Sequence, residues 1–379
     1  MRIGFDAKRA FHNKTGLGNY SRGLIHALAE HFPDENYFLY NPKPADLFHF
    51  NEKNIREINP SNLIYKKFKA LWRSYGMLHE IKKNELDIFH GLSHEIPYNI
   101  RNTGVKSVVT IHDLITFRFP KQFSTFDAFM HQRKIEYACK NADVIIAISE
   151  QTKSDIIEFI HVDPAKIKVC YQHCDTKFSI PKSDSEKSEV LEKLGLPKNY
   201  FLYVGSIIER KNLLRICEAM KINEAKSNLP LVVVGNGGKY KDIVKSFIQK
   251  NDLNDKIIFL SDVSNSKTDI GQDLPELYQA ATALIYPSEF EGFGIPVLEA
   301  LWSGTPVITS SISCLPEAGG PGSYYVDPKS ATEIATAMFK IESDENRRKK
   351  MIATGKEYAL NFTPQKSAEN IMKIYQSLL

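Results

Sequence analysis

The chain has 379 residues, of which 42% are hydrophobic and 25% charged, as in an ordinary globular protein with room for two domains. A net charge of +4 is too small to indicate a nucleic-acid-binding protein, although it permits contact with an anionic membrane. No apolar run approaches the ~20 residues that span a bilayer, and the amino terminus lacks the apolar core of a signal peptide. Five scattered cysteines indicate a reducing compartment, so we expect a cytoplasmic protein.

The chain opens with a predicted strand over residues 2–6, a loop over 8–18 and a helix over 19–31. Gly16 and Gly18 lie near the end of that loop. Glycines between a first strand and a first helix can present free N–H groups to a phosphate. The pattern G-x-G-x-x-S is not the complete dinucleotide fingerprint, however, so a glycine turn required only by packing is the alternative.

Residues 65–84 predict a helix in which aromatic and leucine side chains alternate with lysine and arginine. Such a helix can lie on an anionic membrane with its apolar face down. It can equally pack that face on a sheet and leave its basic face in water. Both interpretations stay open at this point, and the first would place the protein at the inner face of a membrane.

Apolar, β-branched runs of the buried-strand type recur through the first half of the chain, with helices between them. This alternation predicts one doubly wound α/β domain over residues 1–180. One strand ends in His112 and Asp113, at the carboxyl edge where ligands of such sheets bind, and His90 ends a neighbouring strand. The strands of this domain are predicted at residues 2–6, 37–40, 87–90, 107–112, 144–149 and 167–171.

A polar linker over residues 177–198, part of it helical, leads into a second alternation of strands and helices. We therefore expect a second doubly wound domain over residues 181–361. A terminal helix, residues 362–379, is assigned to the first domain by the resemblance given below. The strands of the second domain are predicted at residues 200–205, 231–235, 257–260, 283–286, 306–309 and 323–326.

The stretch from Tyr286 to Ser310 organises the second domain: strand end, glycine loop, helix, turn and strand. Glycines in the loop let backbone N–H groups approach a ligand closely, and the helix that follows offers its positive end. Glu291 lies in the loop and Glu299 eight residues later. If helical throughout, that spacing spans ~12 Å, which suits the two ends of one long ligand rather than one acid–base pair.

The sequence Glu291-GFGIPVL-Glu299 resembles the signature of retaining GT-B glycosyltransferases, in particular the GT4-like family (glycosyl transferases group 1). The resemblance implies two Rossmann-like domains that face each other across a cleft. It implies transfer of a hexose from a nucleotide diphosphate sugar to an acceptor hydroxyl with retention of configuration. Catalytic roles are implied for His112, Glu291, Arg210 and Lys211, and donor-binding roles for Gly16, Gly18, Gly205, Ser206, Gly235, Val263, Gly292, Phe293, Gly294 and Glu299.

Two adjacent cations, Arg210 and Lys211, follow the first strand of the second domain. Cations there suit a pyrophosphate that leaves as an anion. Many members of the family carry an arginine directly after the strand-end glycine, where this chain has Ser206. Arg210 is the candidate for the missing charge, and Lys211 matches the lysine of the family.

No Asp-x-Asp pair and no Cys/His set with zinc spacing occurs in the sequence, so we expect no metal and no other cofactor. We expect a GDP- or UDP-linked sugar, with mannose as the guess, and a saccharide or lipid-linked acceptor in polysaccharide assembly. The alternatives are a nucleotide-sugar epimerase of the same architecture and a nucleotide-sugar-binding protein without activity. A nicotinamide-dependent oxidoreductase would need a complete fingerprint, which neither domain has.

Overall fold

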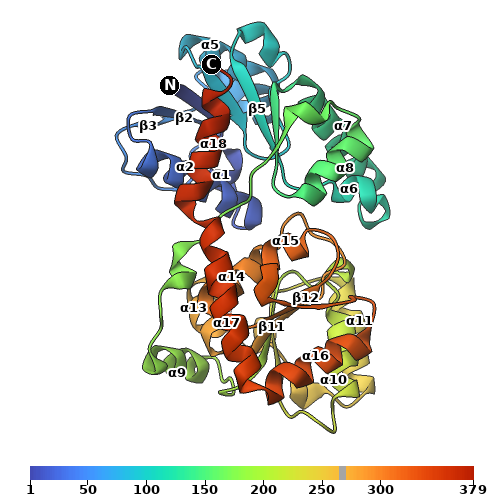
Figure 1. Ribbon diagram of the computed structural model, residues 1–379. Helices are drawn as coiled ribbons and strands as arrows, with labels where there is room; N and C mark the ends of the chain where they lie inside the picture. The colour runs from blue at the N-terminus through green and yellow to red at the C-terminus, as the bar shows by residue number, and fades with distance from the viewer. Residues whose placement is uncertain (264–269) are drawn as a thin grey trace. The chain divides into compact units, whose positions relative to one another are not determined.

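The computed structural model describes residues 1–263 and 270–379, which divide into two compact units (Figure 1). Unit 1 consists of residues 1–173 and 362–379, and unit 2 of residues 174–361. The chain thus leaves the first unit directly after His173, whereas we placed the boundary at 180/181. Each unit is built on one parallel sheet covered by helices, which confirms the predicted fold class of two Rossmann-like domains.

The sheet of unit 1 has seven strands in the order β3-β2-β1-β4-β5-β6-β7, and neighbouring strands run parallel. The order reverses between β1 and β4, and this is the switch point at which open α/β sheets bind ligands. The strands are β1 Arg2–Asp6, β2 Asn36–Tyr40, β3 Ile55–Ile58, β4 Ile88–Gly91, β5 Lys106–Ile111, β6 Val144–Ala147 and β7 Ile167–Val169.

Both faces of this sheet are covered, so its strands are apolar on both sides. In β2, Tyr37 and Leu39 face one hydrophobic core, and Phe38 and Tyr40 face the other. The helical segments are α1 Lys8–His12, α2 Gly16–His31, α3 Leu63–Lys67, α4 Lys69–Leu71, the π-helical turn η1 Trp72–Gly76, α5 Met77–Lys83, η2 Ile100–Thr103, α6 Ile115–Arg118, η3 Pro120–Gln122, α7 Thr125–Asn141, α8 Glu150–Ile160, η4 Pro164–Lys166 and α18 Pro364–Gln376.

The terminal helix α18 lies beside α2 within unit 1 (Figure 1). Its Tyr375 hydroxyl lies 2.6 Å from His90 Nδ1, and His90 Nε2 lies 2.8 Å from the Thr110 hydroxyl. Burial lowers the pKa of His90 to about 3, so the ring is neutral. His90 therefore ties the terminal helix to the sheet, and we assign it a structural role.

Replacing Tyr375 with phenylalanine is expected to lower the free energy of unfolding of unit 1 by about 1–3 kcal/mol, because a buried imidazole nitrogen loses its partner. Calorimetry measures this as a downward shift of the transition of unit 1. Tyr75→Phe, which removes the hydroxyl of an exposed tyrosine in the same unit, is the matched control. Equal shifts for the two variants would contradict the assignment.

Unit 2 has a six-stranded parallel sheet in the order β10-β9-β8-β11-β12-β13, whose order reverses between β8 and β11. The strands are β8 Phe201–Val204, β9 Leu231–Val234, β10 Ile257–Phe259, β11 Ala283–Tyr286, β12 Val307–Ser310 and β13 Tyr324–Val326. The helices are η5 Thr176–Ser179, α9 Asp184–Lys193, η6 Glu209–Lys211, α10 Leu213–Ile222, α11 Lys239–Lys250, η7 Asn254–Lys256, α12 Leu260–Val263, α13 Ile270–Ala280, α14 Ile295–Ser303, α15 Leu315–Gly319, η8 Gly320–Gly322, α16 Ala331–Ser343, α17 Glu345–Ala359 and η9 Leu360–Phe362, whose last residue belongs to unit 1.

Three local predictions are wrong. Residues 65–84 do not form one helix, because the chain leaves the helical conformation at Phe68, between α3 and α4. A π-helical turn follows, in which Trp72 is completely buried in the core. The predicted loop 8–18 contains α1 and the first turn of α2, and β3 was not predicted.

Among the described residues, no helix is both long enough and apolar enough to cross a membrane.

Candidate active site

The carboxyl ends of β8 and β9 approach each other closely through two glycines with positive φ, Gly205 (+151°) and Gly235 (+152°). A Cβ atom on Gly235 would lie 1.9 Å from the carbonyl oxygen of Gly205, so no larger residue fits. A Cβ atom on Gly205 would lie 3.1 Å from Lys211 Nζ. Gly235 thus lets the two strand ends approach closely, and Gly205 leaves space for the side chain of Lys211.

Arg210 and Lys211 lie in the single 3₁₀ turn η6 between β8 and α10. The Lys211 ammonium is 2.7 Å from the Tyr286 hydroxyl at the end of β11, and it lies over the ring of that tyrosine. Arg210 is buried and donates to the carbonyl of Phe290. Arg210 therefore holds the glycine loop in place, a role that the sequence did not indicate.

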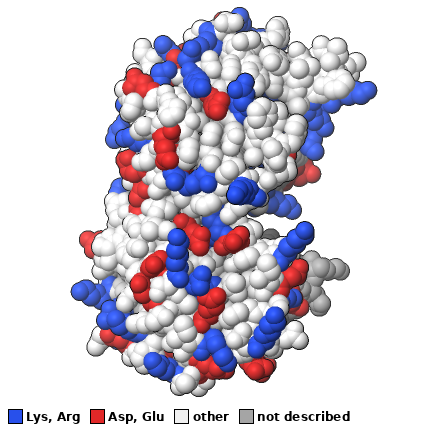
Figure 2. Space-filling model, turned by 90° about the vertical axis from the view of Figure 1, so that its right-hand side faces the viewer, with Lys and Arg blue, Asp and Glu red and all other residues white. Residues whose placement is uncertain are grey.

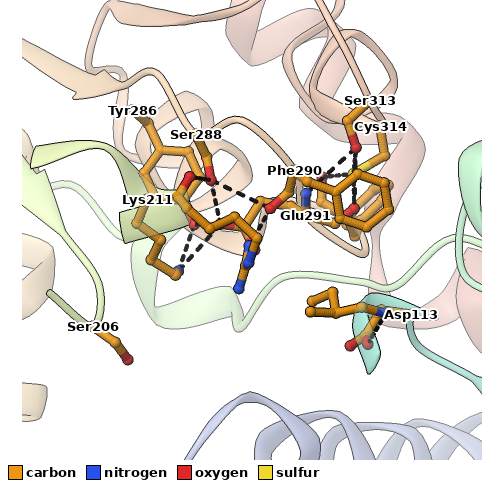
Figure 3. Close-up of polar contacts among 12 residues, drawn as sticks. Asp113, Ser206, Lys211, Tyr286, Ser288, Phe290, Glu291, Ser313 and Cys314 are labelled. Atoms are coloured by element: carbon orange, nitrogen blue, oxygen red, sulfur yellow. Dashed lines mark hydrogen bonds and ion pairs between the residues drawn. The ribbon is translucent and has the colours of Figure 1, made fainter. Parts of the chain in front are cut away.

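Glu291 is the centre of this cluster, and the residue is only 9% exposed (Figure 3). Its Oε1 accepts hydrogen bonds from Tyr286 (2.9 Å) and Ser288 (2.8 Å). Its carboxylate also lies 3.0 Å from Arg210 Nη1 and 3.4 Å from Lys211 Nζ. Burial alone would raise the pKa of Glu291, but the two cations and the two hydroxyls lower it to about 2. The carboxylate is ionised and rigidly held.

The glycine loop continues into α14, for which Gly294 is the N-cap at φ +114°. A Cβ atom there would lie 2.9 Å from Leu315, so the backbone amides at the helix start need a glycine. Below the loop, the Cys314 thiol donates to the carbonyls of Glu291 (3.0 Å) and Phe293 (3.1 Å). The buried Phe293 ring anchors the loop, and the half-exposed Gly292 lies between Glu291 and Phe293 in the chain.

Glu299 lies on α14, one turn inside the helix, and accepts a hydrogen bond from the Tyr278 hydroxyl at 2.8 Å. Burial raises its pKa to about 7, against the opposing effects of Tyr278 and of the charges on Lys177 and Lys211. Unlike Glu291, Glu299 is therefore only partly ionised at neutral pH. Lys211 lowers the pKa of both carboxylates, so the three predicted residues lie near enough to interact electrostatically.

Ser206 and Val263 are two further predicted donor-binding residues of unit 2. Ser206 is exposed just beyond β8, and Figure 3 shows its side chain apart from the Glu291 contacts. Val263 ends α12, beside Asp262, whose carboxylate is paired with Lys241 at 2.8 Å. Tyr286, Ser288 and Tyr278 were missed. Tyr286 and Ser288 adjoin the recognised motif, and their polar groups next to a strand end were the available signal.

In unit 1, Gly16 and Gly18 belong to the first turn of α2. A Cβ atom on Gly18 would lie 1.8 Å from the carbonyl oxygen of Asn13, whereas no atom lies within 4 Å of one on Gly16. The Gly18 amide already donates to Thr15 at 2.9 Å. Packing alone thus requires Gly18, and the exposed Gly16 stays a candidate for contact with phosphate.

His112 follows β5 and is buried, with Nε2 2.9 Å from the carbonyl oxygen of Leu92. Because a carbonyl only accepts, Nε2 carries the proton and Nδ1 is an acceptor. Burial lowers the pKa of His112 to about 4, so the ring is neutral. The centroid of the His94 ring lies 5.3 Å from that of His112, and the centroid of the His131 ring lies 5.2 Å from that of His94. The three imidazoles form a cluster at the carboxyl edge of the sheet.

Within the part of the chain that the structure describes, no three His, Cys, Asp or Glu side chains are grouped to hold a metal ion. The five cysteines are free and buried.

The family model "Glycosyltransferase Family 4" matches residues 15–178, and the model "Glycosyl transferases group 1" matches residues 184–358. The O-antigen chain mannosyltransferase B of Escherichia coli is 25% identical, and the match covers 100% of both chains. The O-antigen chain mannosyltransferase RfbU of Salmonella typhimurium is 31% identical over 86% of this chain and 87% of the relative.

A further relative, the UDP-Gal:alpha-D-GlcNAc-diphosphoundecaprenol alpha-1,3-galactosyltransferase of Escherichia coli, is 26% identical over 74% of this chain and 72% of its own. Among solved structures, Anabaena Alr3699/HepE in complex with UDP and glucose has a TM-score of 0.72 at 16% identity, covering 99% of both chains. The likeness to that structure shows the shared GT-B fold. With relatives of this identity and two family models that cover most of its length, the chain belongs to the glycosyl transferases group 1 family and is a glycosyltransferase.

Proposed function

We propose that the enzyme transfers mannose from a nucleotide diphosphate sugar to an acceptor hydroxyl, with retention of configuration and without a metal ion, during polysaccharide or glycolipid assembly. The observation that carries the proposal is the ionised Glu291, held between Lys211 and Arg210 beside the start of α14. A fixed negative charge, two cations and the N-terminus of a helix, all in unit 2, support the proposal.

Each part has a chemical role in this proposal. Glu291 and the amides of residues 292–294 hold the sugar hydroxyls, and Glu299 accepts hydrogen bonds from the ribose hydroxyls. Lys211 and the positive end of α14 stabilise the charge that develops on the leaving diphosphate, since preorganised electrostatics usually contributes most to the rate enhancement of an enzyme. Arg210 acts through Glu291, because its contacts fix the loop.

Retention follows a same-face substitution in which the leaving phosphate takes the proton of the acceptor hydroxyl. Glu291 is a poor nucleophile for a double displacement, because two cations and two hydroxyls stabilise its negative charge. In this scheme the neutral His112 accepts a hydrogen bond from a sugar hydroxyl at Nδ1. Lys211 and the helix N-terminus replace a metal, so activity should survive a chelator.

The donor is to be identified by a thermal-shift panel of nucleotide sugars, in which we expect GDP-mannose to give the largest stabilisation. Two relatives are named as mannosyltransferases, whereas a solved structure of the same fold contains UDP and glucose, so UDP sugars belong in the panel. NMR of the product should show the anomeric configuration of the donor. An epimerised donor in the absence of acceptor would instead establish the epimerase, and binding without turnover a silent binding protein.

Donor affinity is expected to weaken by up to about tenfold from pH 8 to pH 6, because Glu299 protonates with a pKa of about 7 and then accepts hydrogen bonds poorly. Calorimetric titration with the nucleotide sugar measures this, since the charge on its diphosphate does not change over that range. Glu299→Gln should bind weakly at both pH values. A variant that keeps the full pH dependence would show that another group titrates.

We also propose that unit 1 contacts an anionic membrane through a basic-apolar segment, residues 63–71. Leu63, Ile64, Phe68 and Leu71 are 80%, 60%, 55% and 45% exposed, and the exposed Lys66, Lys67 and Lys69 lie among them. This combination fits an interfacial site. Leu63→Ser/Ile64→Ser should reduce co-sedimentation with phosphatidylglycerol vesicles. Unchanged co-sedimentation would contradict the contact.

A further inference from the structure

A second group of exposed apolar side chains lies on unit 1, at the start of α7. Phe123, Phe126, Phe129 and Met130 are 41%, 72%, 56% and 40% exposed, and we call them the α7 apolar strip. Within the helix, positions 126, 129 and 130 are spaced i, i+3 and i+4, so they share one face. The face of unit 1 that carries α6, α7 and α8 in Figure 1 is turned to the viewer in Figure 2 and is mostly uncharged.

The strip is not needed to hold α7 in the fold. The opposite side of the helix buries Ala128, Ile135, Ala138 and Cys139, and the last three belong to a core of unit 1. A helix that is already anchored gains nothing from four large apolar side chains in water. Grouped apolar exposure of this kind marks a binding surface.

The strip adjoins the histidine cluster. Met130 directly precedes His131, whose ring lies 5.2 Å from that of His94 and whose Nδ1 lies 3.3 Å from the Thr116 hydroxyl. His94 in turn contacts His112, the residue that we place at the donor sugar. A molecule on the strip therefore has one end beside the carboxyl edge of the sheet, within unit 1 alone.

We propose that the α7 apolar strip holds the first isoprene units of a polyprenyl diphosphate-linked saccharide acceptor. This rests on the proposed function, and one relative is named for an acceptor carried on diphosphoundecaprenol. The exposed Arg133 lies at the end of the strip beside the histidine cluster and suits the diphosphate, and its pairing with Glu136 is loose, at 3.7 Å. From residue 126 to residue 130 the helix rises ~6 Å, so only the start of a long chain is held.

The strip fits this occupant better than the headgroups of an anionic bilayer. Asp127 and Glu136 are interspersed with the cations of α7, and Asp127 accepts a 2.6 Å hydrogen bond from the N-cap Ser124. The basic-apolar segment 63–71, by contrast, contains three lysines and no acidic residue. The two surfaces thus differ in charge, and one experiment can separate them.

The test is photocrosslinking of the full chain with a benzophenone-bearing geranylgeranyl diphosphate in neutral detergent micelles, with the labelled peptides mapped by mass spectrometry. We expect the label within residues 121–133, and we expect undecaprenyl phosphate, but not phosphatidylglycerol, to compete for it. Labelling mainly within residues 63–71 would overturn the proposal. Equal competition by phosphatidylglycerol would overturn it as well and would assign the strip to the bilayer.

Phe126→Ser/Phe129→Ser should lower the crosslinking yield at residues 121–133 at least fivefold, and the matched pair Leu63→Ser/Ile64→Ser should leave it unchanged. All four side chains are more than half exposed, so both variants should keep the thermal midpoint of the parent protein. Unchanged yield in the first variant would also overturn the proposal. The thermal shift caused by the nucleotide sugar is recorded in parallel: its absence would refute the proposed function, whereas the crosslink tests the strip alone.

Discussion

Glu291→Gln is expected to lower kcat at least tenfold, which corresponds to about 1.4 kcal/mol of activation free energy. The substitution keeps the shape of the side chain but removes a charge that lies within 3.4 Å of two cations. Arg210 and Lys211 are then left in a buried site without their anion, and the sugar hydroxyls lose a strong acceptor. Steady-state kinetics with the identified donor measures the effect.

The matched control is Glu289→Gln, two residues earlier in the same loop, whose side chain is half exposed. We expect this variant to retain kcat within about twofold, since surface substitutions rarely have large effects. Circular dichroism and the thermal midpoint show whether each variant is folded. A folded Glu291→Gln enzyme with the turnover of the parent would remove Glu291 from the site.

Lys211→Ala is also expected to lower turnover at least tenfold, because in the proposed mechanism its ammonium stabilises the leaving diphosphate. The affinity for a nucleoside diphosphate should fall more than the affinity for the corresponding monophosphate. Calorimetric titration with both nucleotides gives the ratio of the two affinities. A general loss of folding would weaken both affinities alike and leave this ratio unchanged.

Lys221→Ala serves as the control for lost charge, because Lys221 lies at the far end of α10 and pairs with Glu224 at 2.7 Å. It should bind both nucleotides as the parent protein does. If Lys211→Ala weakened the two nucleotides equally, Lys211 would act on the loop rather than on the diphosphate.

The fold could be predicted because parallel strands covered on both faces leave continuous apolar runs, as in β9, Leu231–Val234. The errors arose where tertiary contacts override a local pattern. The aromatic spacing of residues 65–84 is that of a helix, but complete burial of Trp72 accompanies a π-helical turn. The edge strand β3 has only one buried residue, Ile55, and so lacks an apolar run.

The candidate site was predictable where backbone geometry demands a residue type. A positive φ and close neighbouring atoms require glycine at Gly205, Gly235 and Gly294. A glycine that follows a predicted strand or precedes a predicted helix can be recognised from the sequence alone. The direction of a side chain is not visible. Arg210 was expected at the diphosphate, but its guanidinium binds the Phe290 carbonyl and Glu291. Glu291 and Glu299 look alike in sequence, yet their pKa values are shifted in opposite directions.

Hydrogen–deuterium exchange with and without the identified nucleotide sugar tests most directly whether the cluster around Glu291 binds the donor. We predict that saturating donor protects backbone amides within residues 205–212 and 286–299 and that Glu291→Gln loses this protection at the same donor concentration. Protection confined to other segments, or the same protection in the variant, would contradict the account.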